Sequence, residues 1–355
     1  MMVPIRLLTI TLLFTLVAFS ADAAVQGYWG LFMGHSFFRP SAQQLNQLSA
    51  EWGVDGHIGH TIFRGGPNGS PLKLWEDSEV LQDATDLLSG GQIELLALTY
   101  YSAENSRIED YQQWFDLALE SNPEIKFLIT IPWTLGPHRI TPGDLEGLRL
   151  GTLALFDSLI TPLRQRYPNN AVIFCPYGLG AYELIENFFD GELDGVEYLS
   201  AAPSSNSGDE YLFRDATGHA NDLVTTLSTL TWANTLYGVD PTELDPVRVT
   251  NLPEVDLNSF AYEVGQIVMP YNEGLLPPEP PLLVRASFNT TRTHITLSWT
   301  GTSDSRYQIE RSPDFGSGSW TLVETAEGVN GEMTWLDTVD GASMFFRIVP
   351  QASSD

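Results

Sequence analysis

Residues 28–38 read YWGLFMGHSFF, an apolar run that stops at Gly34, His35 and Ser36. If this run is a buried strand, Ser36 lies where the strand ends and the chain turns into a helix, with its hydroxyl facing a crevice. A nucleophile is placed well at such a point. Gly-x-Ser also occurs at residues 301–303 and 341–343, where nothing else supports catalysis, so the motif alone equally fits an ordinary loop serine.

The chain after Ser36 alternates between helical patterns and short apolar runs. The further predicted strands are residues 57–63, 93–99, 126–131 and 171–175; the predicted helices are residues 40–48, 79–88, 108–119, 145–166, 182–189 and a final one at 221–237. Five such runs separated by helices predict a parallel sheet with helices on both faces, a three-layer α/β/α sandwich. The ligand crevice of such a sheet lies beyond the carboxyl ends of its strands. We therefore expect Ser36, Gly66 and Asn105, which follow the first three strands, on one rim.

The two ends of the chain differ from its middle. Residues 1–23 have the charged start, apolar run and small-residue pattern of a secretory signal, so we expect a mature protein outside the cytoplasm that begins near Ala24. Residues 24–270 then form the α/β domain, and residues 271–283 form a stiff linker rich in proline. Residues 284–355 contain short, mostly alternating runs separated by Gly, Ser and Asp turns, which predict a small all-β sandwich.

The net charge excludes some classes of partner, and the cysteine content excludes an internal disulfide. The 355 residues carry a net charge of −28, which argues against nucleic acid and anionic membrane surfaces and favours neutral substrates. No segment is long and apolar enough to suggest membrane insertion. The single cysteine, Cys175, cannot form an internal disulfide and is expected to be a small buried side chain.

A second candidate group lies just before the last predicted helix, where Asp215 and His219 flank Gly218. The imidazole of His219 could reach Ser36 as a general base, with the Asp215 carboxylate holding its other ring nitrogen. In the alternative interpretation Asp215 caps a turn and His219 lies at the surface.

Together these blocks resemble the SGNH, or GDSL-like, hydrolases over about residues 26–240. The blocks are Gly34-His35-Ser36, Gly65-Gly66, Asn105 and Asp215 with His219. The resemblance implies a flavodoxin-like esterase domain in which Ser36, Asp215 and His219 form the catalytic triad and Gly66 and Asn105 contribute to the oxyanion hole. Here His35 stands where the family usually has Asp, and three residues separate Asp215 from His219 where the family usually has two. The C-terminal segment resembles fibronectin type III sandwiches.

Other residue groups admit a second interpretation. His57 and His60 could suggest a metal site, but along a strand they would point to opposite faces, so we expect neither a metal nor a cofactor. Several aromatic residues could stack on sugar rings, although core packing is their commoner use; they are Tyr100, Tyr101, Trp75 and Trp133 near the rim, and Trp299, Trp320 and Trp335 in the sandwich. Residues 68–70 and 289–291 match glycosylation sequons.

The resulting hypothesis is a secreted serine esterase that removes acyl groups such as acetyl from an extracellular carbohydrate. The main rival is a non-catalytic glycan-binding or adhesion protein that retains the same fold. Labelling of Ser36 by a fluorophosphonate separates them, because only an activated serine reacts.

We predict that a chain truncated after Glu279 folds and keeps its esterase activity, because few contacts should cross a proline-rich linker. The measurement is hydrolysis of a short acyl ester by the truncated and full-length proteins. Insoluble or inactive truncated protein would contradict this division of the chain.

Overall fold

The computed structural model describes residues 25–201, 210–247, 249 and 255–275, and the C-terminal residues 285–288, 294–301, 305–312, 321–329, 331–338 and 345–352. The predicted signal segment, most of the predicted linker, Trp320 and the sequon at residues 289–291 lie outside these ranges. Within the described ranges, no helix has the length and apolar character needed to cross a bilayer.

The centre of the first domain is a parallel five-stranded sheet in the order β4-β2-β5-β6-β7. Its strands are β2 (Trp29–Gly34), β4 (Ile58–Phe63), β5 (Leu95–Thr99), β6 (Lys126–Thr130) and β7 (Val172–Cys175). The predicted parallel sheet is confirmed, and the second strand in sequence lies outside the first, as in doubly wound flavodoxin-like sheets. The carboxyl ends of β2, β4 and β5 therefore meet at one edge.

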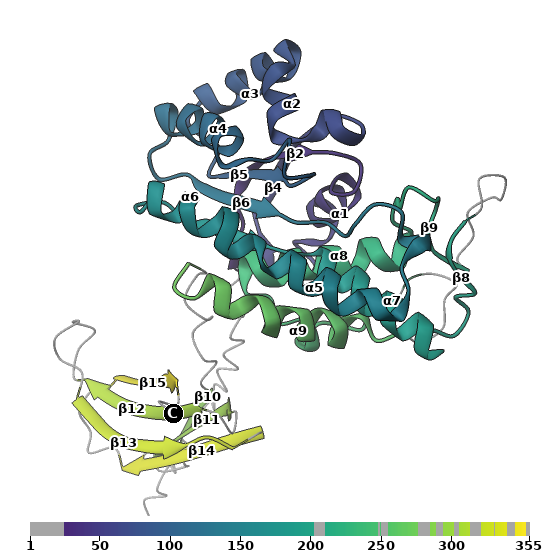
Figure 1. Cartoon of the computed structure of the whole chain (residues 1–355). Coiled ribbons are helices and arrows are strands. Elements are labelled where there is room, and N and C mark those ends of the chain that lie inside the picture. The colour runs from purple at the N-terminus through teal and green to yellow at the C-terminus, as the bar shows by residue number, and fades with distance from the viewer. Residues whose placement is uncertain are drawn as a thin grey trace, which may run out of the picture.

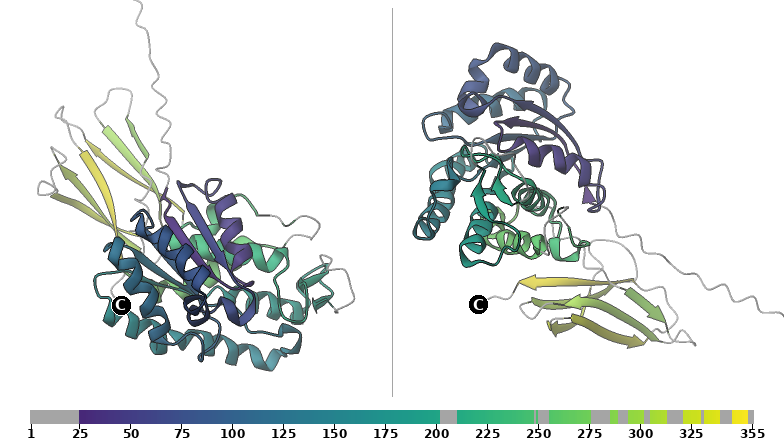
Figure 2. Two further views of the ribbon diagram at one scale, coloured as in Figure 1. Left: turned by 90° about the horizontal axis from the view of Figure 1, so that it is seen from above. Right: turned by 90° about the vertical axis from the view of Figure 1, so that its right-hand side faces the viewer.

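Helices cover both faces of this sheet (Figures 1 and 2). One apolar core lies under α2 (Pro71–Glu76), α3 (Ser78–Ser89), α4 (Ile108–Ser121) and α6 (Thr161–Arg166). The other lies under α1 (Arg39–Leu48), α5 (Leu145–Leu153), α7 (Gly178–Asp190), α8 (Asp222–Tyr237) and α9 (Leu257–Val268). Cys175 is buried, as expected, and burial raises the pKa of its thiol to about 12.

Three predicted helices differ from the observed ones. The helix expected over residues 145–166 is divided by a π-helical turn (Phe156–Ile160) just before Pro162, which has no N–H to continue an α-helix. Helix α7 starts at Gly178, four residues before the predicted start, and glycine is required there because a side chain would come within 2.4 Å of the backbone of Pro132 and Trp133. The helix α8 is not the last one, since α9 follows it.

In each outer strand of the sheet, the backbone of one residue is hydrogen-bonded to an asparagine side chain. Asn46 of α1 donates to the carbonyl of Gly59 in β4 and accepts from its N–H, at 2.8 and 2.6 Å. Asn272, in the short helical turn Met269–Asn272, does the same for Phe174 of β7 at 2.7 and 2.9 Å. Asn272 was placed in the linker by the sequence, yet it is fully buried, so the packed domain extends at least to this residue.

The C-terminal strands form two antiparallel sheets, β10-β11-β14 and β13-β12-β15. They are β10 (Arg285–Phe288), β11 (His294–Gly301), β12 (Ser305–Ser312), β13 (Thr321–Glu327), β14 (Gly331–Thr338) and β15 (Phe345–Ala352). Trp299 is buried edge-on against Tyr307, which confirms a core role for this tryptophan. Trp335 is half-buried at the margin of this core, and its indole N–H donates to Glu324.

Shorter strand pairs complete the first domain: β1 (Val25–Gln26) with β3 (Val54–Asp55), and β8 (Tyr198–Ser200) with β9 (Tyr211–Phe213). His57, between β3 and β4, is 8% exposed and lies 2.7 Å from the hydroxyl of Tyr237, whereas His60 is exposed. Burial lowers the pKa of His57 to about 4.

We predict that His57 makes the protein less stable as the pH falls from 7 to 5. The unfolded imidazole takes up a proton near pH 6.5, but the folded one does so only near pH 4, so acid favours the unfolded chain by on the order of 2 kcal/mol at pH 5. His57→Gln should reduce the difference in unfolding free energy between the two pH values by roughly 1 to 2 kcal/mol. Urea unfolding at both pH values measures this.

The matched control is His60→Gln, three residues away on the exposed side of the same segment. This variant should keep the wild-type difference between pH 7 and pH 5. An equal change in both variants would mean that His57 is not the group responsible.

Candidate active site

Ser36 lies in the turn between β2 and α1, at the carboxyl edge of the sheet, and is half-buried. Gly34 ends β2 beside β5, and a side chain there would come within 2.4 Å of the Thr99 hydroxyl. Only glycine fits this close approach. The turn is closed by a hydrogen bond from the Phe38 N–H to the His35 carbonyl at 3.3 Å, and α1 begins one residue later.

His35 fixes the backbone on both sides of Ser36. Its Nδ1 accepts a hydrogen bond from the Phe37 N–H at 3.3 Å, so its Nε2 carries the proton and donates to the Tyr100 carbonyl at 3.1 Å. The side chain is 3% exposed, and this burial lowers its pKa to about 4. His35 is therefore neutral near pH 7, and it ties the turn that holds Ser36 to the segment after β5.

The structure brings Ser36, His219 and Asp215 together in a hydrogen-bonded row, although 183 positions separate the first two. His219 Nε2 lies 2.8 Å from Ser36 Oγ, and His219 Nδ1 lies 2.6 Å from Asp215 Oδ2. A carboxylate only accepts hydrogen bonds, so the imidazole proton lies on Nδ1 and Nε2 is free to accept from the serine hydroxyl.

Asp215 also organises the loop that carries His219. Its second oxygen accepts from the backbone N–H groups of Thr217, Gly218 and His219 at 3.0, 3.0 and 3.3 Å. Partial burial opposes ionisation, but the bonds from the His219 side chain and from these amides outweigh it, so the pKa of Asp215 is below its usual value. The carboxylate is thus ionised at neutral pH.

Trp133, in the segment after β6, contacts both halves of the site. Its ring stacks on Phe37 at 5.0 Å, and its indole N–H donates to the Gly218 carbonyl at 2.9 Å. The next turn of the same segment adds a bond from the Gly136 N–H to the Thr217 carbonyl at 3.0 Å. The sequence suggested only a sugar platform or a core residue for Trp133; it is buried, and its contacts hold the Ser36 turn against the His219 loop.

Gly66 and Asn105 follow β4 and β5 on the same edge as Ser36, but within the described residues no hydrogen bond joins either of them to Ser36. The contact with the strand end is made by Gly69, where a side chain would come within 2.6 Å of the backbone of Gly34 and His35. The Asn105 carbonyl accepts from the Leu72 N–H, and its side-chain amide has no partner among the described residues. Their oxyanion role stays a prediction.

A pocket of about 350 Å³ opens on Ser36 and His219. Side chains from α1, β4, the 213–220 loop and α8 line it: Arg39, Pro40, Gln43, Phe63, Arg214, Ala220, Asp222 and Thr225. Its size is within the range of small-ligand sites.

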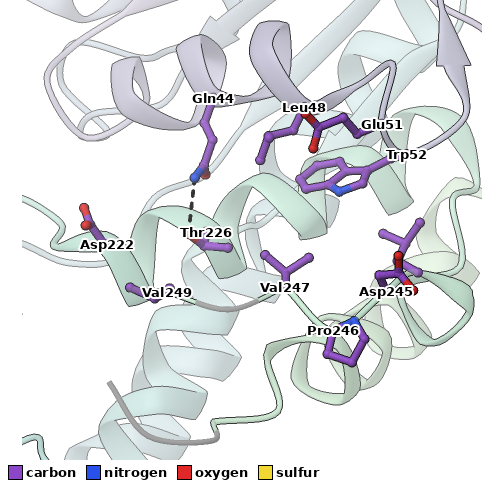
Figure 3. Close-up of a pocket in the computed structure, with 11 residues that line it drawn as sticks. Gln44, Leu48, Glu51, Trp52, Asp222, Thr226, Asp245, Pro246, Val247 and Val249 are labelled. Atoms are coloured by element: carbon purple, nitrogen blue, oxygen red, sulfur yellow. Dashed lines mark hydrogen bonds between the residues drawn. The ribbon is translucent and has the colours of Figure 1, made fainter. Parts of the chain in front are cut away.

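A second pocket, of about 550 Å³, lies between α1, the start of α8 and residues 244–247 and 249 (Figure 3). Asp222 lines both pockets, so the second is a neighbour of the first along α1 and α8. Gln44 crosses it by donating to the Thr226 hydroxyl at 3.2 Å, and Trp52 and Val247 provide apolar walls.

No protein-family model matches the sequence, and no curated protein matches it either. Two solved structures are weakly similar in fold. A DUF4886 family protein from Bacteroides uniformis has a TM-score of 0.48 at 13% identity, covering 71% of this chain and 99% of that one. The periplasmic domain of a lipopolysaccharide acetyltransferase from Salmonella ser. Paratyphi A has a TM-score of 0.33 at 13% identity, covering 59% and 82%. Any function must therefore be inferred from the geometry of the site.

We predict that Gly218→Ala slows labelling of Ser36 by a fluorophosphonate by about tenfold or more. Gly218 has a φ of +106°, and an added side chain would come within 2.7 Å of Pro137, so the loop must shift and carry His219 away from Ser36.

Gly238→Ala is the matched control, because Gly238 at the end of α8 has a φ of +64° with open space around it. It should lower the melting temperature through similar backbone strain without changing the labelling rate. Equal labelling rates in Gly218→Ala and Gly238→Ala would show that the conformation of the turn at residues 215–218 does not control the reactivity of Ser36.

Proposed function

We propose that this chain is a serine esterase of the SGNH type in which Ser36 is the nucleophile, His219 the general base and Asp215 the residue that orients the imidazole. The observation that carries the proposal is the row of two short hydrogen bonds, 2.6 and 2.8 Å long, that ends on a half-buried serine beside a pocket. An ordinary loop serine needs neither the imidazole nor the carboxylate behind it.

In the first half of the reaction, Ser36 Oγ attacks the ester carbonyl carbon while His219 Nε2 takes the hydroxyl proton. The imidazolium that forms is stabilised by the ionised Asp215, whose position is fixed by three backbone amides. The tetrahedral intermediate then expels the alcohol, which receives the proton from His219. The acyl group remains on Ser36.

In the second half, His219 deprotonates a water molecule that attacks the acyl carbonyl, and the carboxylic acid leaves as Ser36 regains its proton. Negative charge develops on the carbonyl oxygen in both halves and needs nearby donors. We assign this role to the Gly66 N–H and the Asn105 side chain, and add the Ser36 N–H, which has no hydrogen-bond partner among the described residues.

For the substrate we propose a small acyl ester, such as an acetyl ester, on a carbohydrate outside the cytoplasm. The secretory pattern of residues 1–23 supports the location. The pocket of about 350 Å³ beside Ser36, with a second pocket next to it, supports an alcohol part larger than the acyl group.

The test is hydrolysis of 4-nitrophenyl acetate by purified wild type and variants. Ser36→Ala should abolish turnover and fluorophosphonate labelling with little change in melting temperature, because the hydroxyl contributes little packing. His219→Ala should be about as damaging, and Asp215→Asn should cost roughly up to 10⁴ in turnover. Because the residues act as a unit, the Ser36→Ala/His219→Ala double variant should be scarcely worse than either single one.

Two results would reject the esterase and favour the non-catalytic glycan-binding protein. One is full activity in Ser36→Ala. The other is a wild type that neither hydrolyses short esters nor reacts with the fluorophosphonate.

A further inference from the structure

The pocket beside Ser36 contains two arginines that come from distant parts of the chain. Arg39 is the first residue of α1, three positions after Ser36, and Arg214 directly precedes Asp215. The Arg214 backbone N–H also donates to the His219 carbonyl at 2.7 Å, which fixes its main chain against the base. Both side chains are exposed.

Neither arginine is paired with a carboxylate among the described residues. The Arg39 guanidinium lies 4.8 Å from the centre of the Phe63 ring, a contact that orients the cation and leaves its charge uncompensated. The Arg214 side chain has no partner in the described part of the chain. Five other arginines do pair with carboxylates: Arg64, Arg107, Arg149, Arg306 and Arg311.

The excess of acidic residues in the chain makes two arginines without a described carboxylate partner unusual. With 17 Lys and Arg against 45 Asp and Glu, a carboxylate is the commoner neighbour for any cation in this protein. Two guanidiniums that have no carboxylate partner among the described residues lie in one pocket beside Ser36, and they mark a place for an external anion. Guanidinium groups recognise carboxylate and phosphate in a bidentate manner.

The pocket also contains an acidic side chain, Asp222, at the first position of α8. No described ion pair joins Asp222 to Arg39 or Arg214, and the amino-terminal end of a helix stabilises its charge. In the described part of the chain, the remaining ionisable groups facing the pocket are His219 and, behind it, Asp215. The anion therefore belongs on the side formed by the two arginines.

We propose that the ester hydrolysed at Ser36 belongs to an acidic carbohydrate, and that Arg39 and Arg214 bind its carboxylate or phosphate group. The proposal rests on the esterase activity proposed above. An acetyl group carries no charge, so the anion lies on the alcohol part of the ester. The net charge of −28 led us to expect neutral substrates, but at physiological salt a charge acts over only about 8 Å, so the two local arginines dominate at this pocket.

Three acetyl esters test the proposal: 4-acetoxybenzoate, 4-acetoxyphenyl phosphate and the neutral methyl 4-acetoxybenzoate. The measured quantity is the ratio of kcat/KM for each anionic ester to that for the neutral one. Arg39→Gln and Arg214→Gln should each lower this ratio by about three- to tenfold, mainly through a higher KM for the anionic ester, and the double variant should lower it further. Arg166→Gln, an exposed arginine on α6 that does not line the pocket, should keep the wild-type ratio.

Raising the salt concentration from about 0.05 to about 0.5 M should reduce the wild-type ratio and leave that of the double variant nearly constant. A preference for the benzoate assigns a uronate-type sugar, and a preference for the phosphate ester assigns a phosphorylated one. If the double variant hydrolyses all three esters with the wild-type ratios, the anion site is refuted while the esterase stands. If the wild type hydrolyses none of them, the esterase itself is refuted.

Discussion

The hydrogen bond between Ser36 and His219 is the contact on which the candidate active site of the first domain depends. It joins the end of the first central strand to a loop 183 positions later, and its length of 2.8 Å leaves little tolerance on either side. Each partner is held by separate means. Ser36 is positioned by β2, by the Gly34–Thr99 approach and by the bonds of His35, whereas His219 is positioned by the Asp215 turn and by the start of α8.

Trp133 connects these two supports. It stacks on the residue after Ser36 and bonds to the residue before His219, so a shift of either segment is transmitted to the other. The segment that carries Trp133 follows β6, whereas Ser36 follows β2 and His219 lies in the loop between β9 and α8. Trp133 thus forms a buried aromatic support for the site and does not line the pocket beside Ser36.

The sequence was sufficient for the parts of this architecture that depend on local patterns. Continuous apolar runs predicted the five strands, their alternation with helices predicted the parallel sheet, and the block residues pointed to Ser36, Asp215 and His219, which the structure brings together. It was insufficient where a residue acts through a distant partner. The predicted helix at residues 182–189 did not include Gly178, which allows close packing against residues after β6, and neither the role of Trp133 nor that of Asn272 has a local signature.

The two asparagines at the sheet margins have a consequence for how copies of this protein meet. An outer strand with free N–H and carbonyl groups is a template on which another chain can add a strand, the first step toward aggregates. Asn46 and Asn272 each occupy both backbone groups of one residue of an outer strand, Gly59 in β4 and Phe174 in β7. An incoming strand would have to displace a side-chain amide that already makes two hydrogen bonds, so each border of the central sheet carries an obstacle to intermolecular pairing.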